Sequence, residues 1–339
     1  MMRAPALRPA LLGILLGVTA GTLAPFAPDL VPGAALALER PVAADTLSVE
    51  ERSRALSDLS ILAHDSMEGR RTGTPGIERA RRFLLEAFEE SGLQPIDERR
   101  LQEFEPSGGS GEPGSRGANI LGVVPGRVFS GRFIVVSAHY DHLGMRGSQI
   151  YNGADDNASG TAALLALASH FSGNPTDHSL LFVAFDAEEM GLLGARAFVS
   201  NPAVPLDSVV LNVNLDMVSR SDAGELYAAG TYHYPFLGEL VAEVAGRSGV
   251  TVLTGHDRPS LPPGDDWTSA SDHGPFHDAG IPFLYFGVED HPDYHRPTDT
   301  VDRIMPEFYL AAVETVLDFI RVADARGASI LAPRARVGR

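Results

Sequence analysis

Apolar runs alternate with amphipathic segments along most of the chain. Runs of consecutive apolar residues predict strands at 119–124, 133–138, 179–185, 208–215 and 282–286. Helical spacing of apolar positions predicts helices at 159–171, 190–199 and 236–246. Strands that alternate with helices in this way are typical of parallel sheets. The pattern therefore predicts an α/β fold with a mostly parallel mixed β-sheet flanked by helices.

Two further helices bound the predicted domain. The first begins at Thr74-Pro75, a cap followed by proline in the first turn, and the last begins at Pro306 and ends near Gly327. The apolar stripe of the first consists of Ile77, Ala80, Phe83, Leu84, Ala87 and Phe88, and that of the last of Leu310, Val313, Leu317 and Ile320. No linker interrupts 50–327, so we expect a single domain over 48–327 and a basic tail over 328–339.

One segment between predicted strands has a different character. The stretch 105–117 is rich in Gly, Ser and Pro, which predicts a flexible loop.

The N-terminus has the layout of a secretory signal peptide. Arg3 and Arg8 precede an apolar run at 10–24, and small-residue sites follow at 35–37 and 42–44. We expect a signal peptide over 1–37, or up to 44 if the later site is used, and export to the periplasm or the medium. The alternative is an uncleaved anchor, but the run is shorter than the roughly 20 residues that span a bilayer. No stable membrane association is expected after cleavage.

Charge and cysteine content narrow the chemistry. The 339 residues include 27 basic and 44 acidic ones, a formal net charge of -17, which argues against a nucleic-acid partner. The chain has no cysteine, so disulfides, thiolate nucleophiles and cysteine-based zinc sites are excluded. Any metal ion must be bound by His, Asp and Glu.

Chemically active side chains follow three predicted strands at the points where the strands end. His139-Tyr140-Asp141-His142 follows the strand at 133–138, Glu188-Glu189 comes soon after the strand at 179–185, and Asp216 follows the strand at 208–215. Ligands of open α/β sheets bind at the carboxyl ends of the strands. Carboxylates gathered there repel one another unless a cation compensates them. A pair of divalent ions such as zinc, manganese or cobalt would do so, and paired metals are typical of hydrolases.

Each motif also has a structural interpretation. His139-x-Asp141 can be an ordinary hydrogen-bonded pair, the segment 153–160 can be a helix cap, and Glu188-Glu189 can be a solvated first turn. The order and spacing of all of them together favour a functional site.

The combined motifs resemble the co-catalytic di-zinc aminopeptidase family, which includes aminopeptidase Y, glutamate carboxypeptidase and glutaminyl cyclase. The resemblance covers about residues 60–325 and rests on these motifs: Glu68-Gly69-Arg70, Gly73-Thr74-Pro75-Gly76, His139 to Gly144, Gly153 to Gly160, Ala187 to Gly191, Asn214 to Met217, Ser271-Asp272-His273 and His295 to Thr300. It implies a fold of the zinc-exopeptidase type and two Zn²⁺ ions per chain, with Co²⁺ or Mn²⁺ as substitutes.

The resemblance also implies residue roles. His139 and Asp216 would bind one zinc, Glu189 and His295 the other, and Asp156 would bridge both. Asp141 would orient His139, and Glu188 would be the general base. Two zinc ions would balance the charges of the three ligand carboxylates, Asp156, Glu189 and Asp216, and of a bridging hydroxide. The cluster would therefore be about neutral. A tyrosine that polarises the substrate carbonyl in some members is not evident before Ser271, where Trp267 and Thr268 lie.

The expected function is that of a secreted di-zinc metallo-exopeptidase, an aminopeptidase that removes N-terminal residues from peptide substrates by means of the metal-bridging hydroxide. A carboxypeptidase is an alternative, with Arg146, Arg220 or Arg296 as the cation for the substrate carboxylate. A glutaminyl cyclase of the same fold would use a single zinc, and the presence of both His139 and Asp216 argues against it. A non-catalytic binding module is the remaining alternative.

Overall fold

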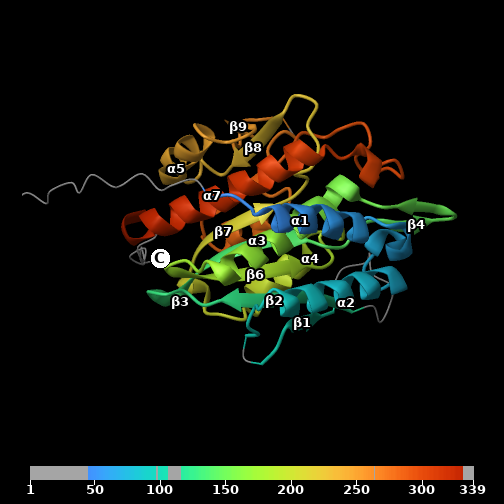
Figure 1. Cartoon of the computed structure of the whole chain (residues 1–339), viewed down its shortest axis with the longest axis horizontal. Coiled ribbons are helices and arrows are strands. Elements are labelled where there is room, and N and C mark those ends of the chain that lie inside the picture. The colour runs from blue at the N-terminus through green and yellow to red at the C-terminus, as the bar shows by residue number, and fades with distance from the viewer. Residues whose placement is uncertain (1–44, 97, 106–115, 263, 331–339) are drawn as a thin grey trace, which may run out of the picture. The chain divides into compact units, whose positions relative to one another are not determined.

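A mixed β-sheet with helices on both faces forms the frame of the protein (Figure 1). The computed structural model describes residues 45–96, 98–105, 116–262 and 264–330, with side chains as far as residue 326. The expected signal peptide, most of the predicted loop at 105–117 and residues 331–339 of the expected tail lie outside the described residues. Among the described residues, no helix combines the length and the apolar character that a membrane span needs.

The sheet has eight strands in the order β1-β2-β6-β3-β7-β10-β8-β9. Their bounds are β1 Leu101–Phe104, β2 Gly117–Val124, β3 Phe129–His139, β6 His178–Phe185, β7 Val209–Leu215, β8 Glu225–Ala229, β9 Thr251–Thr254 and β10 Phe283–Gly287. Strands β6, β3, β7 and β10 run parallel to one another at the centre, whereas β1, β2 and β8 pair antiparallel to their inner neighbours. A separate hairpin is formed by β4 Gly144–Arg146 and β5 Gln149–Tyr151. The predicted mostly parallel mixed sheet is confirmed.

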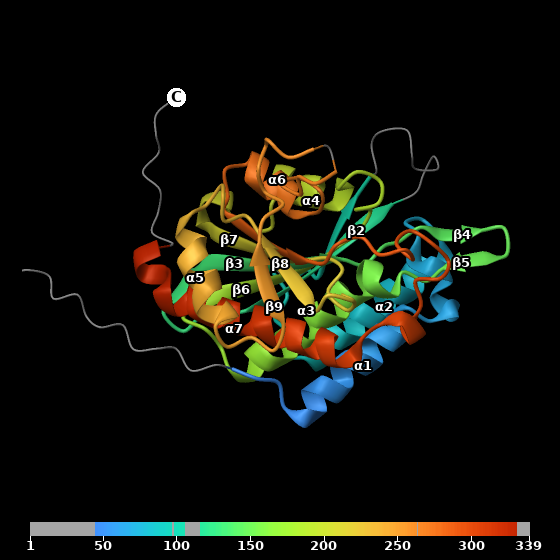
Figure 2. The same ribbon diagram turned by 90° about the horizontal axis from the view of Figure 1, so that it is seen from above.

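Seven α-helices are described, and they cover the sheet unequally (Figure 2). They are α1 Val49–Leu62, α2 Pro75–Glu90, α3 Gly160–Gly173, α4 Leu193–Ser200, α5 Phe236–Ala245, α6 His273–Asp278 and α7 Pro306–Ile330. Apolar residues of α1, α2, α3, α5 and α7 pack into one large core on one face. Residues of α4 and α6 pack into a smaller core on the other face.

The central strands are mostly apolar along their buried lengths because both of their faces are covered. In β3, Ile134 and Val136 belong to the large core, whereas Val135, which points the other way, belongs to the small one. The parallel register aligns His139 at the end of β3 with Phe185 at the end of β6. The residues that follow the central strands are therefore brought to one edge of the sheet.

The structure differs from the predicted elements at several points. Helix α1 was not predicted, although Ser48 and Glu51 form a capping box at its start. Helix α7 continues past Gly327 to Ile330, because a glycine weakens a helix by only about 1 kcal/mol and does not by itself end it. The short strands β1 and β9 were also missed, since no residue in either is fully buried. β8 was missed as well, because its apolar run, 226–229, has only four residues.

Candidate metal centre

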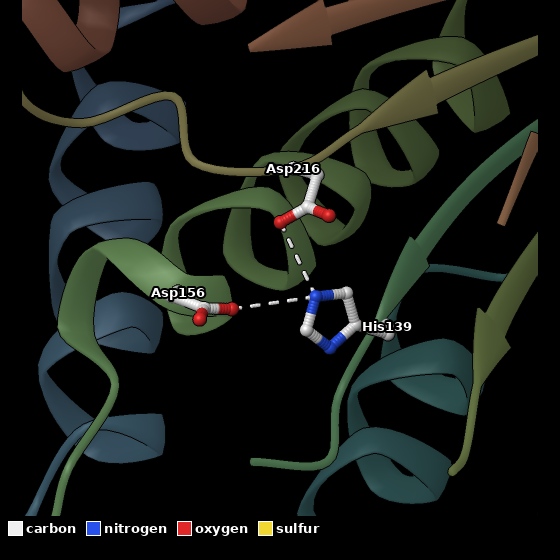
Figure 3. A group of neighbouring side chains, drawn as sticks. All are labelled: His139, Asp156 and Asp216. Atoms are coloured by element: carbon white, nitrogen blue, oxygen red, sulfur yellow. Dashed lines mark hydrogen bonds and ion pairs between the residues drawn. The ribbon is translucent and has the colours of Figure 1, made fainter. Parts of the chain in front are cut away.

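Three side chains from different segments meet at the carboxyl edge of the central strands (Figure 3). His139 is the last residue of β3, Asp216 directly follows the neighbouring strand β7, and Asp156 lies in the turn that leads into α3. The Nε2 atom of His139 lies 3.2 Å from Oδ1 of Asp216 and 3.4 Å from Oδ1 of Asp156. All three residues are buried. The sequence prediction placed these residues at one site, and the structure brings them together.

The second oxygen of Asp156 faces a different group of side chains. Its Oδ2 atom lies 3.0 Å from Nε2 of His295, which is itself 3.3 Å from Oε2 of Glu189. Glu189 follows β6, and His295 comes from the loop after β10. One oxygen of Asp156 thus points to each histidine, which is the arrangement that a bridging ligand requires.

The turn that carries Asp156 is held in place by neighbouring polar groups. The carboxylate of Asp299 accepts hydrogen bonds of 3.0–3.1 Å from the backbone N–H groups of Asp155 and Asp156. The side chain of Asn157 donates to the carbonyl of Leu215 at 2.9 Å and accepts from the N–H of Met217 at 3.2 Å. These bonds tie the Asp156 turn to the segment that carries Asp216.

Asp141 contacts both His139 and the loop of the two glutamates. Nδ1 of His139 lies 3.2 Å from the backbone carbonyl of Asp141 and 3.7 Å from its carboxylate. The same carboxylate accepts from the N–H of Glu188 at 3.0 Å and from that of Glu189 at 3.4 Å. Asp141 therefore contacts His139 and accepts hydrogen bonds from the backbone of both glutamates.

Several residues at or beside the expected site have strained backbone conformations. Ala187, Met217 and His295 have φ values of 59°, 59° and 55°, in the left-handed region that costs a residue other than glycine about 1 kcal/mol or more. Ala187 precedes Glu188, and Met217 follows Asp216. Strain of this kind is typical of functional sites, where the surrounding structure holds an otherwise unfavourable conformation.

The buried charges perturb one another strongly. Burial lowers the pKa of His139, but the carboxylates of Asp216 and Glu188 outweigh this effect and raise it well above its ordinary value. Burial and the neighbouring Glu189 carboxylate raise the pKa of Asp156. Burial likewise raises the pKa of Glu188, further assisted by Asp216 and Asp272. Carboxylates crowded in this way favour a bound cation.

The chemistry of the donors fits a pair of zinc ions. Within the described chain, ligand atoms converge in two groups that can each hold a metal ion, His139 with Asp156 and Asp216, and His142 with Asp156 and Glu189. Imidazole nitrogens and carboxylate oxygens are ordinary zinc ligands, and a carboxylate common to two groups is suited to a two-metal site. His295 faces the second group from the cleft side, with 38% of its side chain exposed.

His142 lies closer to this centre than the sequence indicated. Its Nδ1 atom lies 2.7 Å from Oε1 of Glu189 and 3.6 Å from Oδ2 of Asp156. The side chain is fully buried. Its position three residues after His139, in a segment that leaves the strand, gave no signal of this contact.

Arg70 is a second residue whose place the sequence did not reveal. Its buried guanidinium donates to the backbone carbonyls of Leu62, Tyr140, Asn152 and Gly153, at 2.6–3.0 Å. Burial lowers its pKa to about 10, against the raising effect of Asp156. Arg70 therefore connects the segments that carry His139 and Asp156 and brings positive charge near the carboxylates.

A cleft of about 550 Å³ opens onto the centre. Its lining includes the five expected metal ligands, Glu188 and a set of apolar and aromatic residues, namely Leu192, Met217, Trp267, Tyr285, Val288 and Tyr294. The ring of Tyr294 stacks on His295 with 3.9 Å between centroids. The cleft thus holds two tyrosines, although neither lies before Ser271, where the sequence analysis looked for one.

The arginines that the carboxypeptidase alternative requires are not among the lining residues of this cleft. Arg220 forms an ion pair with Asp293. The guanidinium of Arg146 lies over the ring of Tyr151, 4.8 Å from its centroid.

Known proteins match the part of the chain that carries the candidate metal centre. The sequence profile described as peptidase family M28 matches residues 119–320, a span that carries all five expected ligands and Glu188. The chain belongs to peptidase family M28. The resemblance to the co-catalytic aminopeptidases is thereby confirmed.

Individual M28 relatives extend this comparison. Aminopeptidase YwaD of Bacillus subtilis (strain 168) is 34% identical over 202 residues, which are 56% of this chain and 41% of that protein. Curated M28 relatives of this kind are longer proteins, of which the chain spans about half. Two solved structures share the fold: BSAP, a zinc aminopeptidase from Bacillus subtilis, has a TM-score of 0.64 and 20% identity, covering 82% of this chain and 97% of that chain. Fimbriiglobus ruber glutaminyl cyclase has a TM-score of 0.65 and 22% identity, covering 84% and 99%.

Proposed function

We propose that this M28 member is a di-zinc aminopeptidase that hydrolyses N-terminal residues from peptides. The observation that carries the proposal is the position of Asp156, whose two carboxylate oxygens face His139 and His295 separately. Membership of the peptidase family supports hydrolysis of peptide bonds, and the aminopeptidase names of relatives such as YwaD favour action at the N-terminus. The predicted signal peptide adds export to this proposal.

The residues divide into ligands and a base. His139 and Asp216 would hold one ion, Glu189 and His295 the other, and Asp156 both. When bound, the ions would supply Lewis acidity and would lower the pKa of the attacking water, as in the expected bridging-hydroxide mechanism. Glu188, which lines the cleft beside them, would accept the proton of that water and pass it to the leaving amine.

The cleft lining also favours a type of N-terminal residue. Leu192, Met217, Trp267 and Val288 offer apolar surface next to the metal ligands. We therefore propose that the enzyme prefers peptides with an apolar first residue. A leucyl dipeptide is the natural first substrate.

Chelation combined with blocked substrates tests the proposed function. We expect a chelator to abolish hydrolysis of a leucyl dipeptide and added zinc to restore it. The same peptide with an acetylated amino group should be a poor substrate, and a peptide that begins with glutamine should be hydrolysed without cyclisation. Hydrolysis that persists in the chelator would contradict the metal mechanism. Faster cleavage of the acetylated peptide would favour a carboxypeptidase, and cyclisation would favour a glutaminyl cyclase.

His142 is placed to orient one of the ligands. Its Nδ1 atom faces Oε1 of Glu189, which leaves Oε2 directed at His295 and the proposed metal position. A hydrogen bond to a ligating carboxylate fixes its direction, and loss of such a bond typically weakens metal binding about 10- to 100-fold. We expect His142→Ala to weaken binding of one zinc ion by about that factor. His142→Asn should retain most of the affinity, because its amide N–H can replace the Nδ1–H donor.

Zinc competition against a chromogenic chelator measures this effect without any peptide substrate. Equal affinities of the wild type and His142→Ala would show that His142 does not orient Glu189. An equal loss of zinc affinity in His142→Ala and His142→Asn would instead show that an imidazole nitrogen of His142 binds the metal itself. That result would contradict the positioning role.

A further inference from the structure

The charges that line the metal cleft are almost all negative. Five carboxylates lie in its wall, those of Asp156, Glu188, Glu189, Asp216 and Asp290. Arg196 is the one arginine among the described residues of that lining. The chain as a whole carries a formal charge of -17. In the zinc-loaded site, where the ions would balance Asp156, Glu189 and Asp216, the remaining carboxylates of the wall are Glu188 and Asp290. Arg196 is then the cation of the described lining that could attract a negatively charged end of a substrate.

A hydrogen bond orients the side chain of Arg196, but no carboxylate of the described residues neutralises its charge. It lies in α4, soon after the loop that carries Glu188 and Glu189, and its Nε donates to the carbonyl of Gly191 at 3.2 Å. Gly191 also lines the cleft and is only two residues from Glu189. The side chain is exposed and forms no ion pair with a carboxylate of the described residues. The Nη groups are thus free to bind an anion.

Arg196 lines the cleft that holds the expected metal ligands. The same side chain also borders a neighbouring cavity of about 490 Å³, lined by residues of β1 and α4. A peptide that leads from the metal ligands toward Arg196 would present its next groups to the guanidinium. One residue of extended chain spans about 3.3–3.6 Å, so the terminal carboxylate of a dipeptide lies only one residue beyond the scissile bond.

We propose that Arg196 binds the free α-carboxylate of the residue that leaves, and that short peptides, dipeptides above all, are the preferred substrates. This inference rests on the proposed peptidase function. A guanidinium offers parallel N–H donors that match a carboxylate, which an ammonium group does not. The ligand is the C-terminal carboxylate of the substrate itself, and the proposal assigns it to a cation that the sequence analysis had not considered.

Matched substrates test the assignment. The specificity constants for Leu-Gly and for Leu-Gly-amide differ only through the terminal carboxylate. We expect the zinc-loaded wild type to prefer Leu-Gly by about two- to fivefold, the range of an exposed charged pair, and the preference to shrink at high salt. In Arg196→Gln the ratio should fall to about one, mainly through a higher KM for Leu-Gly. Arg196→Lys should retain only part of the preference.

A control variant removes a positive charge elsewhere. Arg82 is an exposed arginine of α2 that does not line the cleft, so Arg82→Gln should keep the wild-type ratio. A ratio that is the same in the wild type and in Arg196→Gln would overturn the proposal. The proposal would also be overturned if Arg196→Gln lowered the specificity constant for Leu-Asp-amide but not that for Leu-Gly. Arg196 would then bind an acidic side chain of the substrate and not its terminal carboxylate. If the zinc-loaded wild type hydrolyses none of these peptides, the proposed function itself fails.

Discussion

Replacing Glu188 with glutamine should lower kcat by about 10²-fold or more while both zinc ions stay bound. Glutamine has nearly the same shape as glutamate but cannot accept the proton of the attacking water. General acid–base groups typically contribute factors of 10² to 10⁴. The expected loss therefore falls on the chemical step, and KM should change much less. Glu188 is not one of the converging ligands, so the variant should keep its metal.

Steady-state kinetics with a leucyl dipeptide, together with zinc analysis of the same sample, separate these effects. Ala187 and Asp141 hold the Glu188 backbone in its unusual turn, so the shape of the loop should survive the substitution. Turnover close to that of the wild type would refute the base assignment. Loss of zinc along with activity would mean that Glu188 is a ligand.

The central sheet and three of the five expected ligands could be predicted from the apolar pattern of the strands and from parallel pairing. The strands that precede the expected ligands are mostly apolar, and their carboxyl ends lie together because they are parallel neighbours. This argument alone brings His139, Glu189 and Asp216 to one edge. Asp156 and His295 lie in loops, where no periodicity locates a side chain. Their expected roles came from the resemblance to the peptidase family.

The features that the sequence did not reveal depend on contacts between distant segments. Arg70 reaches carbonyls as far away as Gly153, 83 residues along the chain, and nothing in its own segment specifies that contact. The bond from His142 to Glu189 depends on the path of the backbone after β3. The same holds for Tyr294, which enters the cleft because the loop folds back over the centre. By contrast, the capping box of α1 is a local signal that could have been read.

Replacing Asp156 with alanine should remove both zinc ions as well as the activity. Each carboxylate oxygen of Asp156 faces a different histidine, so its loss takes one ligand from each metal position. The remaining carboxylates, Glu189 and Asp216, would leave each ion with one histidine and one carboxylate from the expected set. Zinc sites with protein ligands usually need at least three. The turn itself should persist, because Asp299 and Asn157 hold it through other groups.

Zinc content per chain, measured by atomic emission after dialysis against zinc-free buffer, tests the two-metal centre most directly. We predict two equivalents in the wild type and less than one in Asp156→Ala, with thermal unfolding still cooperative in the variant. Two equivalents in Asp156→Ala, or none in the wild type after zinc loading, would contradict the account.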